Sequence, residues 1–242
     1  MRLKLMCVVA HPDDECFGFG GALALAAERG IETYVICLTD GRAASNRGDA
    51  ASGEALGKMR RDEFRGSCEV LGVSQHELMD YHDGRLEFVE IPIAAGRLVE
   101  RMRRFKPDVV ITFGGDGGQN THADHMMASM LTTAAFHWAG QAKRYPDAGA
   151  IHKAKRLYYL SANFHMPGRP PAMTIPWTVT LDIRSVRARK NEAFRQHVSQ
   201  APLMEQTKAM FEQYGAEEFY TLIATAEPQA ARQGTDLFEG LS

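Results

Sequence analysis

Short apolar runs alternate with longer amphipathic segments along most of the chain. The short runs are rich in Val, Ile and Leu, which predicts strands buried on both faces, and the longer segments repeat apolar residues at helical spacing. Strands are predicted at residues 3–10, 33–38, 78–81, 108–113, 156–160 and 178–183. Helices are predicted at residues 17–29, 54–71, 92–105, 123–139 and 185–198.

Alternating strands and helices build right-handed crossovers and a mostly parallel sheet with helices on both faces. We therefore predict an α/β fold, a Rossmann-like doubly wound sheet of strand order 3-2-1-4-5. The 242 residues contain no repeat or linker, so we expect one domain over residues 1–242. The polar segment 40–53 and the Pro- and Gly-rich segment 164–176 are predicted as loops that border a pocket.

Composition narrows the class of partner. The formal net charge is -2 and the sequence pI is about 6.5, which argues against nucleic acid as a partner. No apolar run is long enough for a membrane span or a signal peptide, so we expect a cytoplasmic protein that does not bind membranes. The four cysteines form no CxxC pair and are predicted to be reduced core thiols, not metal ligands.

Two polar clusters carry candidate chemistry. His11-Pro12-Asp13-Asp14 directly follows the first predicted strand, and His122-Ala123-Asp124-His125 follows the fourth strand through a glycine-rich loop. A polar helix-capping turn would explain the first cluster, and a solvated first helical turn the second. In a doubly wound sheet, however, both clusters fall in the crevice where ligands bind.

The donor atoms of the two clusters suit a metal-assisted hydrolase. Catalytic zinc sites commonly use two histidines and a carboxylate and keep one open position. The two clusters supply such a set and leave one aspartate and one histidine for proton transfer. The sequence therefore predicts a hydrolytic metal site that joins the two clusters.

Both motifs resemble those of the LmbE/PIG-L family of zinc-dependent de-N-acetylases. The resemblance rests on Ala10-His11-Pro12-Asp13-Asp14-Glu15 and on His122-x-Asp124-His125, and it extends over most of the chain. Supporting matches are Arg60-x-x-Glu63, Asp83-Gly84, Gly117-Gly118 and the C-terminal set Lys190, Ala193, His197, Ser199 and Gln200. Ala123 stands where the family usually has proline, a change that we expect to alter loop stiffness more than chemistry.

The resemblance implies a role for each matching residue. His11, Asp14 and His125 would bind Zn²⁺, although two histidines and a carboxylate also suit Fe²⁺. Asp13 would be the general base, and His122 would stabilise the oxyanion and protonate the leaving amine. Asp124 would orient a histidine, and Arg60 and Asp83 would bind substrate. A surface ion pair between Arg60 and Glu63, and an ordinary turn at Asp83-Gly84, are the structural alternatives.

The expected function is metal-dependent hydrolysis of a linear amide. The substrate would be a small N-acetylated molecule, such as an N-acetylglucosamine-containing glycoside or a thiol precursor, and the enzyme would form a homo-oligomer. A thiol-conjugate amidase on the same scaffold is the alternative.

Two further alternatives belong to other classes of protein. A dinucleotide-binding domain would use Gly18-Phe19-Gly20-Gly21 and Asp40, but Leu23 replaces the third glycine of that fingerprint. In addition, residues 11–15 separate the strand from the glycines. A non-catalytic carbohydrate-binding module would need no general base, so it would tolerate replacement of Asp13.

Overall fold

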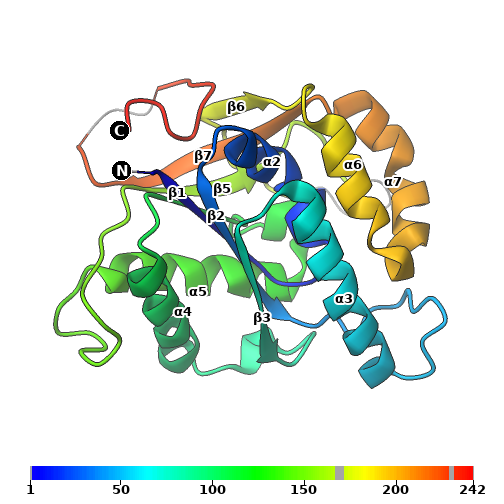
Figure 1. Cartoon of the computed structure of the whole chain (residues 1–242), viewed down its shortest axis with the longest axis horizontal. Coiled ribbons are helices and arrows are strands. Elements are labelled where there is room, and N and C mark those ends of the chain that lie inside the picture. Colours follow the sequence, from blue (N-terminus) through cyan, green and yellow to red (C-terminus); the bar gives the residue numbers. More distant parts are fainter. Residues whose placement is uncertain (1, 167–171, 229–231, 242) are drawn as a thin grey trace.

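The sheet has the predicted doubly wound core and an added antiparallel edge (Figure 1). The computed structural model describes residues 2–166, 172–228 and 232–241, and within them seven strands form one sheet of order β3-β2-β1-β4-β5-β7-β6. Neighbouring strands from β3 to β5 are parallel, whereas β7 is antiparallel to β5 and β6. The strands are β1 Lys4–Val9, β2 Glu32–Thr39, β3 Gln75–Tyr81, β4 Val109–Thr112, β5 Arg156–Ser161, β6 Val179–Asp182 and β7 Glu217–Thr225.

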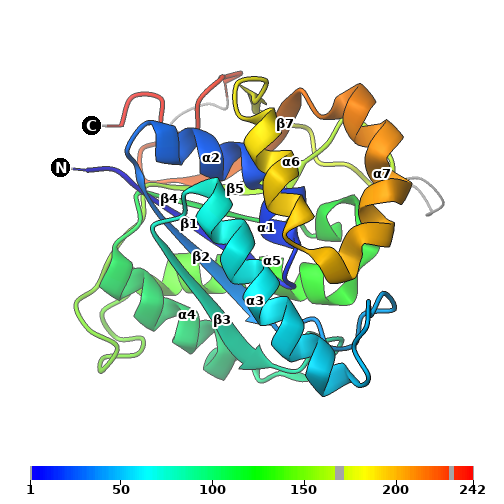
Figure 2. The same cartoon turned by 45° about the vertical axis from the view of Figure 1, so that its right-hand side comes forward.

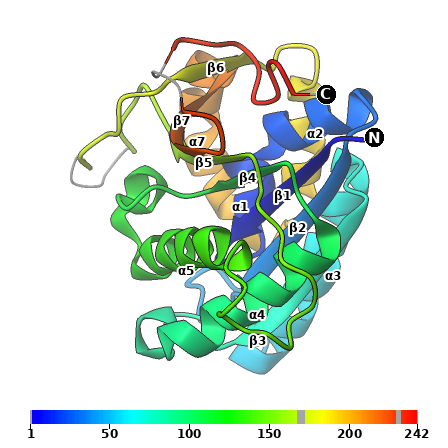
Figure 3. The same ribbon diagram turned by 90° about the vertical axis from the view of Figure 1, so that its left-hand side faces the viewer.

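Helices cover both faces of the sheet. The helix α4 packs against α5 on one face, and α2, α3 and α6 pack together on the other (Figures 2 and 3). The helix α7 follows α6 and lies beside it at the end of the molecule (Figure 1). The helices are α1 Asp14–Phe17, α2 Gly20–Glu28, α3 Gly53–Leu71, α4 Ile91–Phe105, α5 Ala123–Ala139, α6 Arg187–Arg195 and α7 Ala201–Tyr214, with short turns η1 Leu86–Phe88, η2 Gly117–Thr121 and η3 Val198–Gln200.

The apolar runs that predicted strands are buried because helices cover both faces of the sheet. Residues 5–9 of β1 and all of β4 are buried, and β2 is buried along all but its first residue. The predicted order 3-2-1-4-5 is confirmed. All four cysteines are free and buried, as predicted.

The later part of the chain departs from the prediction. The sequence pattern ends with a helix at residues 185–198, whereas the structure ends α6 at Arg195 and adds α7 and β7. The predicted helix at residues 17–29 is also interrupted, since α1 ends at Phe17 and α2 begins at Gly20. In the predicted loop 164–176, Phe164 and Met166 line a cavity, as expected, and residues 167–171 lie outside the described residues.

The helices offer no candidate for a membrane span. Over residues 2–166, 172–228 and 232–241, no helix has both the length and the apolar character that crossing a bilayer requires.

Candidate active site

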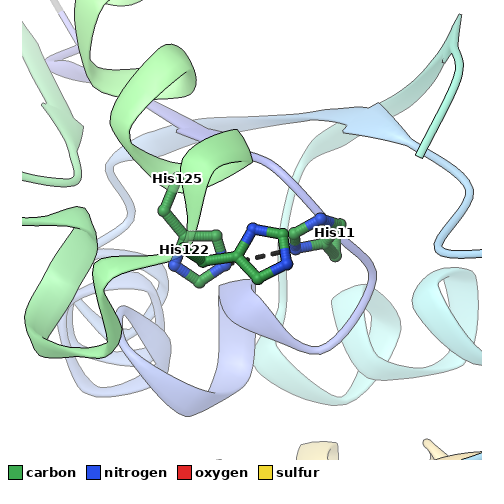
Figure 4. Close-up of side chains that lie close together, drawn as sticks. All are labelled: His11, His122 and His125. Atoms are coloured by element: carbon green, nitrogen blue, oxygen red, sulfur yellow. Dashed lines mark hydrogen bonds between the residues drawn. The ribbon is translucent and has the colours of Figure 1, made fainter. Parts of the chain in front are cut away.

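The topology of the sheet brings the two polar clusters together. Strand β1 is hydrogen-bonded to β4 in parallel, with Met6 opposite Val110, so the segments that follow both strands leave the sheet at the same edge. His11 comes after β1, and His122 and His125 come from the start of α5 (Figure 4). All three line one cavity of about 630 Å³. This is the switch point of the doubly wound sheet, where ligands bind.

Donor atoms of three residues converge at distances close to those of a tetrahedral metal site, and Asp14 faces the two rings through different oxygens. His11 Nδ1 lies 3.2 Å from His125 Nε2. Asp14 approaches both rings, with Oδ1 at 3.1 Å from His125 Nε2 and Oδ2 at 3.5 Å from His11 Nδ1. Ligands bound to zinc at roughly 2.0–2.1 Å in a tetrahedron lie about 3.3 Å apart. The residues that the resemblance implies as ligands therefore fit the size of the ion.

In His11 and His125, the ring nitrogen that points away from the cluster makes a hydrogen bond. That bond determines which nitrogen carries the proton and which faces the cluster. His125 Nδ1 donates to the Gly117 carbonyl at 2.9 Å, which leaves the lone pair on Nε2. His11 Nε2 lies 3.1 Å from Asp83 and 3.2 Å from Asp124, which leaves the lone pair on Nδ1. When both rings are neutral, as metal binding requires, two lone pairs and a carboxylate oxygen face one another.

The electrostatics also favour positive charge at this point. Burial lowers the pKa of His11, but hydrogen bonds to Asp124, Asp14 and Asp83 raise it well above its usual value overall. Burial raises the pKa of Asp14, but the nearby His125 and His11 hold it well below its usual range. A carboxylate that stays ionised beside two imidazoles is a suitable ligand for a divalent metal.

Gly117 allows the glycine-rich loop to pass close to this cluster. Its φ of +72° lies in the left-handed region, where a side chain is strained. A Cβ atom at this position would lie 3.1 Å from the backbone nitrogen of His122 and 3.4 Å from the Cβ of His125. The glycine therefore lets its carbonyl reach His125 Nδ1.

Asp13 lies beside the donor cluster in a strained backbone conformation. Its φ is +104°, and its N–H donates to Glu15 Oε2 at 2.9 Å. Its carboxylate accepts from Arg60 Nη2 at 3.0 Å. Burial raises the pKa of Asp13 to about 6, and the Arg60 guanidinium opposes this increase. A carboxyl group with a pKa near neutrality suits general-base catalysis.

Arg60 is buried rather than part of a helix-surface ion pair. Its guanidinium contacts the carboxylate of Asp13 and donates to the carbonyls of Pro12 and Gly41, and the side chain lines the cavity. The alternative of a surface pair with Glu63 is therefore wrong, because Glu63 instead accepts from the Ser199 N–H and hydroxyl at 2.7 Å each. A contact between Arg60 and substrate stays a prediction.

Asp83 and Asp124 lie side by side around His11. Asp83 Oδ1 faces His11 Nε2, and Asp83 Oδ2 accepts from the Ala43 N–H at 2.7 Å. Asp124 contacts the same ring nitrogen and accepts from the Gly84 and Leu86 N–H groups at 2.7 and 3.1 Å. Asp124 is thus placed to orient His11. Asp83 shares that position and also lines the cavity, so its predicted role in substrate binding stays a prediction.

His122 presents a proton donor to the cavity. Its Nδ1 accepts from the Asp124 N–H at 3.2 Å, so the proton of the neutral ring is on Nε2. Burial and the neighbouring His11 and His125 lower the pKa of His122. A neutral imidazole with Nε2–H can donate to a developing oxyanion.

A buried network behind Asp13 was not predicted. Glu15 is fully buried and accepts hydrogen bonds from Ser67 Oγ at 2.5 Å and from the Asp13 N–H, and it lies 2.7 Å from His197 Nε2. Burial alone would raise the pKa of Glu15, but the nearby His197 and the hydrogen bonds from Ser67 and the Asp13 N–H together lower it below its usual value. The carboxylate is therefore ionised at neutral pH. The sequence signal was a third acidic residue directly after Asp13-Asp14, in a segment whose next residues are apolar.

The structure argues against the dinucleotide-binding alternative. Helix α2 begins at the glycine-rich segment, but the carboxylate of Glu218 already accepts from the Gly21 and Ala22 N–H groups at 2.6 and 2.9 Å. A pyrophosphate would need those same donors. A protein carboxylate therefore occupies the position at which a dinucleotide would bind.

Fold and site together define a doubly wound α/β protein with a two-histidine, one-carboxylate cluster at its switch point. The family model described as GlcNAc-PI de-N-acetylase (PIG-L) matches residues 6–136, which include both polar motifs. The chain belongs to this family.

Curated relatives and solved structures agree with the family match. The chain is 31% identical over 186 residues to mycothiol S-conjugate amidase from Streptomyces coelicolor, a match that covers 69% of this chain and 63% of that protein's length. It is 28% identical over 287 residues to 1D-myo-inositol 2-acetamido-2-deoxy-alpha-D-glucopyranoside deacetylase from Salinispora arenicola, covering 98% and 91%. The structure of N,N'-diacetylchitobiose deacetylase from Pyrococcus horikoshii matches with a TM-score of 0.75 and 21% identity over 91% of this chain and 83% of that one, which shows the shared fold.

Proposed function

We propose that this protein is a zinc-dependent amide hydrolase that removes the acetyl group from an N-acetylated amino sugar. The observation that carries the proposal is the convergence of His11 Nδ1, Asp14 Oδ1 and His125 Nε2 beside the buried Asp13. The matching relatives, a deacetylase and an amidase, both cleave carbon–nitrogen bonds by name. The donor set of two imidazoles and a carboxylate is one that zinc prefers.

Each residue of the site has a separate role in the proposed reaction. His11, Asp14 and His125 would hold the metal, which supplies Lewis acidity and lowers the pKa of water. Asp13 takes a proton from the attacking water, and its Arg60 contact fixes the orientation of the carboxylate. His122 donates its Nε2–H to the amide oxygen as negative charge develops there. The proton taken by Asp13 then passes to the leaving nitrogen as the carbon–nitrogen bond breaks.

Two observations support an N-acetylated sugar as the substrate. The family model and the deacetylase of Salinispora arenicola both bear names of N-acetylglucosaminyl compounds. In addition, the cavity of about 630 Å³ is of the size that ordinarily encloses a small organic molecule. The alternative, a thiol-conjugate amidase, is favoured by the 31% identity to mycothiol S-conjugate amidase and would use the same residues in the same roles.

Amine release from a panel of N-acetylated sugars and thiol conjugates tests the proposal. We expect turnover with one equivalent of zinc per chain, loss of turnover after removal of the metal by a chelator, and recovery when zinc is added back. The metal content of each preparation is measured alongside. Turnover that is unchanged in metal-free protein would contradict the mechanism, and preference for thiol conjugates would favour the amidase alternative.

A further inference from the structure

The cavity that contains the catalytic cluster continues into a second part with apolar walls. Phe17, at the end of α1, lies three residues after Asp14 and lines this part, so one helical turn connects the two. The same part is lined by α7, which presents Leu203, Met210, Phe211 and Tyr214 and packs against Phe17 through Phe211. These four residues recur at helical spacing and occupy one face of α7. We call this part of the cavity the apolar arm site.

The aromatic rings of the apolar arm site are held in place by one another. The ring centroids of Phe17 and Phe211 are 4.7 Å apart in an edge-on arrangement. Phe164, from the loop after β5, stacks on Tyr214 with centroids 5.4 Å apart. Such pairs orient the rings before any ligand binds. The wall is therefore formed in advance, which lowers the entropy cost of binding.

The wall of α7 keeps apolar surface open to the cavity. Leu203, Phe211 and Tyr214 are only partly buried, although each contacts the body of the protein or another ring. An apolar ligand that covered them would gain about 25 cal/mol for each Å² of apolar surface removed from water. A polar ligand would gain nothing comparable from this surface.

The charged groups near the apolar arm site are arranged so that none selects a charged ligand. Lys190 Nζ lies 2.6 Å from Glu218 Oε1, and both side chains are buried. Glu218 also accepts from two backbone N–H groups and from the hydroxyl of Tyr220 at 2.9 Å. The opposite charges of Lys190 and Glu218 thus offset each other, and both oxygens of the Glu218 carboxylate already accept hydrogen bonds. Glu217, which also lines the cavity, is acidic and disfavours an anionic ligand.

We propose that the substrate carries an uncharged apolar arm, alkyl or aromatic, that binds along the cavity face of α7 beside Phe17. This inference rests on the proposed amide hydrolysis and names the class of group that accompanies the reacting amide. The arm is attached either through the glycosidic oxygen of the sugar or in place of the acetyl methyl group. A polyol or a carboxylate at the same position would leave the apolar wall uncovered.

Matched substrates test the inference and distinguish the two attachments. The reference is the methyl glycoside of N-acetylglucosamine, compared with its octyl and phenyl glycosides and with the N-octanoyl analogue of the methyl glycoside. A glycoside with a terminal carboxylate on an alkyl chain is the charged control. We expect kcat/KM with zinc-loaded enzyme to rise roughly tenfold to a hundredfold for an apolar arm at one of the two attachments, and not for the charged control.

Variants in α7 locate the binding of the arm. Phe211→Ala is expected to reduce the ratio of kcat/KM between the apolar-arm substrate and the reference by about tenfold, and Tyr214→Ala provides an independent change at the end of the helix. Met204→Ala is the matched control, because Met204 is a partly buried residue of the same helix that does not line the cavity. This control should leave the ratio unchanged.

The outcomes separate this inference from the proposed function. If the reference is hydrolysed and no apolar arm increases kcat/KM, or if the carboxylate arm increases it as much, the inference is overturned and the proposed function stands. An increase that Phe211→Ala and Tyr214→Ala both leave intact places the arm elsewhere and also overturns the inference. If no amide is hydrolysed with any metal, the proposed function fails and the inference fails with it.

Discussion

The two regions of the chain differ in how they build the cavity. The first, from β1 through α5, forms the parallel part of the sheet from β3 to β4 and supplies all the residues of the candidate metal cluster. The second, from β5 through β7, adds the antiparallel edge and supplies the apolar wall. The family model matches residues 6–136, which lie in the first region. The candidate chemistry therefore lies in the first region, whereas most of the apolar wall lies in the second and Phe17 of the first region joins it.

Three buried polar contacts are among those that join the two regions. His197 reaches Glu15, Ser199 reaches Glu63, and Glu218 caps the N-terminus of α2. Each joins a residue of the second region to a charged or backbone group of the first. Because these partners are buried, loss of one member leaves the other without compensation. The second region thus stabilises the first without supplying groups to the reaction centre.

The largest expected effect of a single change is on turnover, in the first region. Asp13→Asn keeps the size of the side chain but removes the base, so we expect kcat to fall about 10²- to 10⁴-fold with zinc content unchanged. The free energy of unfolding should also fall, because the asparagine can still accept from Arg60 but no longer balances its buried charge. Steady-state kinetics and metal analysis measure both, with the exposed Asp62→Asn as control. Full activity in Asp13→Asn would show that Asp13 is not the general base.

The first region is also the one that the sequence predicts well. Its strands are buried on both faces, so apolar runs such as residues 5–9 mark them directly, and strand order follows from the alternation with helices. The two polar motifs interrupt that pattern at strand ends, where polar residues without a structural reason stand out. The role of Glu15 in positioning its neighbours was not predicted. The residues around Glu15 give no sign that His197, which is far away in the sequence, lies against it.

The second region was predicted less well because the burial of its side chains depends on the cavity and on partners that are far away in the sequence. The apolar face of α7 is short and is interrupted by Gln206, which lines the cavity beside Leu203 and Met210. Strand β7 begins with Glu217 and Glu218, an unusual start for a strand. Glu218 is nevertheless buried there because Gly21, Ala22 and Lys190 satisfy its carboxylate. Such tertiary compensation is not visible in a local pattern.

The second largest expected effect is on stability, in the second region. Glu218→Ala leaves the buried Lys190 without its partner and two N–H groups of α2 without an acceptor, so we expect the free energy of unfolding to fall by about 3–5 kcal/mol. Glu217→Ala is the matched control, since Glu217 is the exposed neighbour on the same strand and should change stability by less than about 0.5 kcal/mol. Chemical denaturation measures both. Equal effects of the two variants would show that the cap of α2 contributes nothing.

The smallest expected effect concerns the link between the regions and depends on pH. Burial lowers the pKa of His197, but the Glu15 carboxylate outweighs this and raises it above its usual value. A raised pKa in the folded state stabilises the protein fully below the unfolded value of about 6.5, and this contribution is lost as pH rises through the folded value. The difference in unfolding free energy between wild type and His197→Gln should therefore be about 1–2 kcal/mol at pH 6 and smaller at pH 9. A difference for His197→Gln that is constant across this range would mean that the imidazole acts only by packing.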